Sequence, residues 1–412
     1  MNNRSDPMRF NLLDIDPKRL IFALFLTAGY FKSDPRLTWV PVDLTVASAA
    51  LLMIAVLHSL VTEPLRLNAA LPLTLAIAVV MSVSLIFTTW TPYGVEKATR
   101  FYTLTLLAFL APVFLIRDLG DARKLFNSLS IIGLAVTVDA SFTLLGTLGT
   151  ANAISRLKTV GASAISLARI AGTAGTWLII GMLQGSTRQF MASSIGVAGI
   201  TIVMLANGSR GPLLAIVLSL CAAMLLFYKR DGKAVSRGIG IAGIIVLSVG
   251  IGFAIAPSQS RQRISSFLSD PTGVNEEDTQ SVEIREDASK IALVEIGKSP
   301  LGLGWGGFDE LSLAHNAPVV YPHNLVLEVF VEMGWLSGLC LCGLLGYVFY
   351  RSAVLGSRTR RIEANALFTL LLFSFANSLV SGDLNDNRIL FTLMTTALAL
   401  PVEAATNMWV AA

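Results

Sequence analysis

Polar clusters interrupt an otherwise apolar chain, and the first of them has residue types suited to binding an anion. Residues 207–212 join two apolar stretches and contain Ser209 and Arg210. Pro212 suits the first turn of a helix, and the positive end of such a helix favours anions. The guanidinium of Arg210 would add a planar set of donors for phosphate oxygens. These residues fit an anion site, but their spacing alone fits an ordinary interfacial turn with a snorkelling arginine as well.

The second cluster surrounds Arg285 in a long polar segment. The stretch Ser281–Ile296 has apolar residues at helical spacing, and Gly297 and Pro300 end the pattern. Such a helix could lie on a membrane surface or cap a cavity. Arg285 is a candidate anion ligand on it, and its acidic neighbours offer the alternative of a solvated ion-pair face.

The third cluster contains His323 and Asn324, directly before an apolar run. An imidazole at a membrane boundary could act as a general base near neutral pH. The alternative is a helix cap or an interfacial polar residue. His315 and Asn316 have the same composition but lie deeper in the polar segment, so we rank them lower.

The fourth cluster, residues 381–388, includes Asp383 and Arg388 in a short break between the last two apolar stretches. Capping of two helix ends would explain part of this density. Three charges also fall inside apolar stretches, where each is a functional candidate because burial in hydrocarbon is costly. They are Glu328, Glu332 and Arg169, the last with Asp139 as a conceivable partner.

The elements that must position these residues are membrane helices. The 412-residue chain is 54% hydrophobic and 14% charged, whereas soluble domains are about one quarter charged. About twelve apolar stretches approach the roughly 20 residues that a spanning helix needs, and hydrocarbon requires them to be helical. We predict an all-α polytopic protein with spans at 20–32, 42–61, 70–89, 101–116, 126–148, 162–183, 190–206, 211–228, 238–256, 323–349, 363–381 and 388–406.

The distribution of lysine and arginine predicts the orientation. With a cytoplasmic N-terminus, the inner segments carry about 17 of these residues and the short outer loops about 8. We therefore expect a cytoplasmic tail at 1–19, spans one to nine at 20–256, a long outer loop at 257–322, spans ten to twelve at 323–406 and a C-terminal tail at 407–412. Both termini would be cytoplasmic and all four polar clusters would face outward.

Other classes of site find little support. The net charge of +4 reports membrane topology rather than nucleic-acid binding. The three cysteines lie in apolar stretches without metal-ligand spacing or a disulfide pattern, and the three histidines do not form a metal motif. We expect no metal site and no nucleic-acid partner.

The order of the clusters resembles the O-antigen ligase and polymerase family. His323-Asn324 followed by Gly334 is similar to the signature that opens a late helix in these ligases. The same order includes Ser209-Arg210-Gly211 at a helix start, an arginine-bearing helix followed by Pro300-Leu301-Gly302-Leu303-Gly304, and the 382–388 loop. The resemblance covers roughly residues 200–390 and is mainly topological before that.

This resemblance implies a GT-C-like membrane glycosyltransferase in a bacterial inner membrane. Its donor would be a glycan on undecaprenyl diphosphate, and its acceptor a hydroxyl of lipid A–core or of another lipid-linked glycan, on the periplasmic side. By position, Arg210 and Arg285 would bind the diphosphate and His323 would be the catalytic base. Ser209, Asn324, Asp383 and Arg388 would support them, with no metal or other cofactor.

Two alternatives remain open. A polymerase of O-antigen, capsule or exopolysaccharide repeat units shares these motifs with a ligase. A secondary transporter or flippase also commonly has about twelve helices, but it would show charges near the membrane midplane in both halves, whereas these clusters gather at one side.

Overall fold

The computed structural model describes residues 11–401 except 33, 65–67, 148–162, 257–260, 262–275 and 318. The predicted tail at 407–412, most of the tail at 1–19 and the first part of the long loop lie outside these residues. The described chain is all-helical and contains no strand. Its first helices are α1 (Pro17–Phe31), α2 (Leu44–Thr62), α3 (Ala70–Ser82), α4 (Pro92–Arg100), α5 (Leu106–Leu115) and α6 (Leu119–Thr147).

The later helices match most of the predicted positions, and short π or 3-10 turns extend some of them. They are α7 (Ala164–Gln184), α8 (Thr187–Ala206), α9 (Arg210–Ala223), α10 (Gly232–Ile255), α12 (Glu276–Lys298), α13 (Gly307–Ala314), α14 (Leu325–Thr359), α15 (Ile362–Ser378) and α16 (Arg388–Ala399). A 3-10 turn, η5 (Leu384–Asn387), precedes α16.

Among the described residues, nine helical segments are long and apolar enough to cross a membrane. The three other predicted spans coincide with α1, α15 and α16, which have 15, 17 and 12 residues. The polytopic helical fold is therefore confirmed, and the count of twelve stays a prediction.

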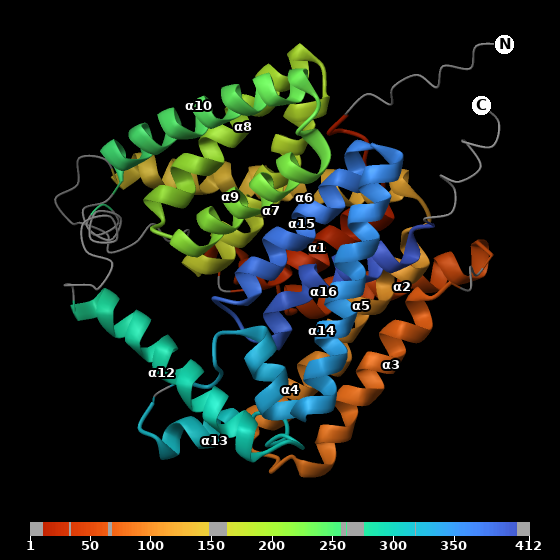
Figure 1. Cartoon of the computed structure of the whole chain (residues 1–412), viewed down its shortest axis with the longest axis vertical. Helices are drawn as coiled ribbons and strands as arrows, with labels where there is room; N and C mark the ends of the chain where they lie inside the picture. The colour runs from red at the N-terminus through yellow and green to blue at the C-terminus, as the bar shows by residue number, and fades with distance from the viewer. Residues whose placement is uncertain are drawn as a thin grey trace.

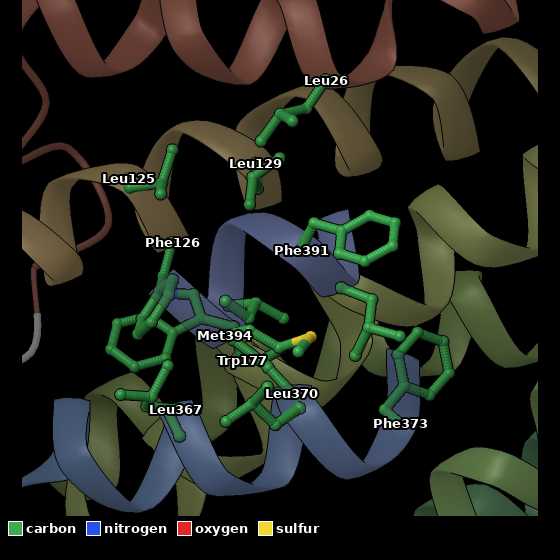
Figure 2. Close-up of a cluster of buried hydrophobic side chains, with 14 of the residues drawn as sticks. Leu26, Leu125, Phe126, Leu129, Trp177, Leu367, Leu370, Phe373, Phe391 and Met394 are labelled. Atoms are coloured by element: carbon green, nitrogen blue, oxygen red, sulfur yellow. The ribbon is translucent and has the colours of Figure 1, made fainter. Parts of the chain in front are cut away.

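The core joins helices from both halves of the chain. Figure 1 shows α7–α10 on one side and α2–α5 with α14 on the other, with α1, α15 and α16 between them. Trp177 of α7, fully buried, packs against Phe126 of α6, and side chains of α15 and α16 close around it (Figure 2). The indole N–H of Trp177 donates to Asn127 Oδ1 at 2.9 Å, so the ring is buried without losing its hydrogen bond.

Helix α14 is broken at Gly334, where the backbone has φ 79° and ψ 176°. The break frees carbonyls that hydrocarbon would leave unpaired. The glycine-dense segment after α12 satisfies them: the amides of Leu303 and Gly304 donate to Val331 O and Glu332 O, each at 2.9 Å. The amide of Trp335 in turn donates to Pro300 O at 2.9 Å. The first ten residues of α14 therefore form a separate segment, held by the loop.

The described part of the long loop is more ordered than its sequence indicates. The predicted amphipathic helix is confirmed as α12, and a further short helix, α13, follows in a stretch for which we predicted no helix. In Figure 1 both lie at one end of the molecule, beside α4 and the start of α14. The segment before residue 101, which we predicted to lie outside the fourth span, is also helical: α4 continues into α5.

Candidate functional site

Helix α12 lies against the first segment of α14. Ala288 and Ala292 are fully buried in a small cluster with Phe308 and Val331. Small side chains let the two helices approach closely. Arg285 lies one turn before Ala288, and it reaches the region of Tyr321 and His323, with which it interacts electrostatically.

Arg285 has the freedom to bind a ligand. Its neighbours Glu286 and Asp287 interact instead with Lys290, at 2.8 and 3.7 Å. Across the described residues, no carboxylate forms an ion pair with Arg285, so the alternative of an ion-pair face does not describe it. Burial lowers the pKa of this half-buried guanidinium, with a smaller opposing effect from Tyr321.

His323 is held in a strained and enclosed position. Its φ is 56°, a region that residues other than glycine rarely occupy. The imidazole packs edge-on against Tyr321, with ring centroids 4.5 Å apart, and its Nδ1 is buried with no hydrogen-bond partner among the described residues. Burial and then the charge of Arg285 lower the pKa of His323 to about 4. The imidazole is therefore neutral near pH 7 and can accept a proton.

Arg169 of α7 lies at the same end, and its partners are carbonyls. Its guanidinium donates to Ser381 O at 2.5 Å, Asn377 O at 3.2 Å and Asp386 O at 3.3 Å. The suggested pairing with Asp139 is wrong, because Asp139 binds Arg36 at 2.6 Å. Arg169 thus fixes the turn between α15 and α16 and brings a cation whose charge is not cancelled by a directly bonded carboxylate.

The start of α9 lies next to that turn. The hydroxyl of Ser209 donates to Ala164 O at 3.3 Å and accepts from Asn207 Nδ2 at 2.9 Å. A Cβ added at Gly211 would lie 3.1 Å from the side chain of Val380. This puts half-buried Arg210 beside the turn that Arg169 binds. Its convergence with Arg285 and His323 on one phosphate-sized space stays a prediction.

Two of the predicted supporting residues act as helix caps. Asn324 caps α14 by accepting from the amides of Val326 and Leu327, at 3.0 and 3.1 Å. Asp383 and Asp386 form a reciprocal capping box around η5. Burial, and then the neighbouring charge of Asp383, raise the pKa of Asp386.

A buried triad of charged side chains, which the sequence analysis did not predict as a unit, connects the helices and turns around the site. Lys97 Nζ lies 2.6 Å from Glu328 Oε1 and 2.7 Å from Glu332 Oε1, and all three side chains are 0% exposed. Glu328 also accepts from the amide of Leu384, and Glu332 from the amide of Gly306, each at 3.1 Å. The triad therefore joins α4, the start of α14, the glycine-dense loop and η5. The two glutamates were singled out in the sequence, but Lys97 was missed because it lies in a polar stretch outside the predicted span.

Residues 195–342 match the protein family described as O-Antigen ligase. This match, over about a third of the chain, supports its relation to the O-antigen ligase and polymerase family. The matched range runs from within α8 into α14 and contains Arg210, Arg285 and His323, whereas Lys97, Arg169 and the 381–388 turn lie outside it. No curated protein matches the chain.

The match to O-antigen ligases supports an activity of the membrane glycosyltransferase type. In the described parts of the chain, no group of three or more His, Cys, Asp or Glu side chains is arranged to hold a metal ion.

Proposed function

We propose that this protein transfers a glycan from undecaprenyl diphosphate to an acceptor hydroxyl on the periplasmic side of a bacterial inner membrane, with both termini cytoplasmic. The observation that carries the proposal is the proximity of Arg285, which forms no ion pair with a described carboxylate, to the neutral imidazole of His323, whose Nδ1 has no partner among the described residues. Both lie in the segment that matches the O-antigen ligase family.

In this proposal Arg285 and Arg210 bind the diphosphate of the donor. Developing negative charge on the leaving diphosphate is stabilised best by donors that are already in place in a site of low dielectric constant. His323 accepts the proton of the acceptor hydroxyl as its oxygen attacks the anomeric carbon. The bond from that carbon to the diphosphate oxygen breaks, and undecaprenyl diphosphate leaves with the electron pair, giving inversion at the anomeric carbon.

Two acceptor classes fit this reaction. Lipid A–core as acceptor would make the protein a ligase, and a second lipid-linked repeat unit would make it a polymerase. Purified protein in lipid vesicles should convert an undecaprenyl-diphosphate-linked glycan and one of these acceptors into a joined product, and should do so in the presence of a chelator. Failure with both acceptors, together with uptake of the lipid-linked glycan across the vesicle membrane, would overturn the proposal in favour of transport.

A further inference from the structure

Arg388 is a second arginine that binds the η5 turn, in addition to Arg169. This side chain, at the start of α16, is only 9% exposed. Its Nε donates to Asn385 O at 3.2 Å, and its guanidinium lies 5.6 Å from the ring centroid of Phe25 on α1. Within the part of the chain that the structure describes, Nη1 is buried without a hydrogen-bond partner, so its two donors are unused.

The acids near Arg388 are already occupied. Asp383 and Asp386 each accept from the other's backbone amide, at 2.9 and 3.4 Å. Asp43 accepts from the amide of Thr45 at 2.7 Å and lies 3.3 Å from Lys32 Nζ. No ion pair joins Arg388 to any of these carboxylates in the described structure, although they are near enough to attract it electrostatically.

A second arginine lies close by. Arg100, at the end of α4, is near enough to Arg388 to repel it. Its own ion pair with Glu96 is loose, at 3.6 Å, and largely exposed. Two arginines within electrostatic range of each other, one of them buried with an unused donor, form an arrangement that an anion would stabilise. Gly29 of α1 lies next to the guanidinium, because a Cβ there would be 3.9 Å from Arg388 Nη2.

We infer that Arg388 and Arg100 bind a phosphate or diphosphate group of the acceptor lipid. The inference rests on the proposed function, because a transferase that joins two membrane-anchored molecules must hold two anionic head groups at once. Arg285 is on α12, which packs against the first segment of α14, whereas the guanidinium of Arg388 lies over Phe25 of α1. The two arginines would therefore bind different lipids.

The test measures the apparent KM for acceptor and for donor separately in Arg388→Met, Arg388→Lys and wild-type protein. We expect Arg388→Met to raise the acceptor KM at least about tenfold, the effect of losing a hydrogen bond to a charged group, and to change the donor KM by less than about twofold. Arg388→Lys should recover part of the loss. With an acceptor stripped of its phosphates, wild type and Arg388→Met should become equal. Equal changes in both KM values, or a persistent difference with the stripped acceptor, would overturn the inference.

A matched control is Arg351 of α14, which binds the opposite end of the helix that Arg388 begins. Arg351 donates to Leu400 O at 2.8 Å and to Ala397 O at 3.3 Å, at the other end of α16. Arg351→Met should leave the acceptor KM unchanged. Retention of phosphorylated lipid A–core, or of a diphosphate-linked repeat unit, by the purified protein provides a readout without transfer. If wild type transfers nothing, the proposed function fails, and equal retention by wild type and Arg388→Met would separately reject this site.

Discussion

His323 combines a left-handed backbone, a buried nitrogen without a partner and a lowered pKa. Each feature costs free energy, and such costs concentrate at functional sites. The substitution His323→Asn separates function from folding, because asparagine tolerates the left-handed region and cannot act as a base. We predict that transfer falls about 100-fold or more, while the thermal unfolding temperature stays within a few degrees. Transfer at the normal rate would remove the assignment of His323 as base.

The pH dependence of the reaction follows from the same side chain. Arg285 and burial hold the pKa of free His323 near 4, so the base is lost only as the pH falls toward that value. A bound diphosphate would offset the charge of Arg285 and raise the pKa of His323. The acidic limb of kcat, which reports the donor-bound protein, should therefore lie at higher pH than the acidic limb of kcat/KM. If the acidic limbs of kcat and kcat/KM coincided, the proposed coupling between diphosphate binding and the pKa of His323 would be contradicted.

At the residue scale, the sequence predicted site residues best where a charged or polar side chain interrupts an apolar region. Arg285 and His323 stand out in residue type and position, and the structure puts them within electrostatic range of each other. The capping roles of Asn324 and Asp383 were foreseeable only as alternatives, because a cap and a ligand have the same residue types. Arg169 was noticed as a charge inside a span, but its carbonyl partners depend on the position of a turn more than 200 residues away.

At the scale of elements, the break in α14 is the feature on which the loop depends. A Cβ at Gly334 would lie 2.6 Å from the backbone of Leu301, and φ there is +79°. We predict that Gly334→Ala lowers the free energy of unfolding by at least about 2 kcal/mol, through strain and the displaced loop, and abolishes transfer.

Gly343→Ala is the matched control in the same helix, because nothing lies within 4 Å of its added methyl. It should be neutral or stabilising by up to about 1 kcal/mol. Equal unfolding temperatures for the two variants would contradict the role of the break.

The triad of Lys97, Glu328 and Glu332 makes a second prediction for the elements. Lys97→Met would leave two carboxylates buried without their cation, which costs about 3–5 kcal/mol. The triple variant Lys97→Met/Glu328→Gln/Glu332→Gln removes all three charges and should recover much of that loss. Thermal unfolding in detergent, followed by tryptophan fluorescence, would measure the stability of both variants. If Lys97→Met were as stable as wild type, the triad would not be what holds α4 against α14.

At the scale of the whole molecule, the hydropathy of the chain predicted the helices well. Nine segments meet the length and apolarity of a membrane span, at positions close to the prediction. The sequence could not show that α4 continues into its span, because hydropathy counts Lys97 as polar whether or not two glutamates neutralise it. The continuous apolar run after His323 also hid the break at Gly334, because the cause of the break is a loop that packs against the helix from outside.

The central claim for the molecule is that Arg285 and His323 border one space that receives a diphosphate. The chain has three histidines, so a variant with His58→Gln and His315→Gln leaves His323 as the one imidazole that diethyl pyrocarbonate can modify. We predict that inorganic pyrophosphate slows this modification severalfold, and that Arg285→Met in the same background abolishes the protection. Modification of His323 at the same rate with and without pyrophosphate, or equal protection in the Arg285→Met protein, would contradict the account.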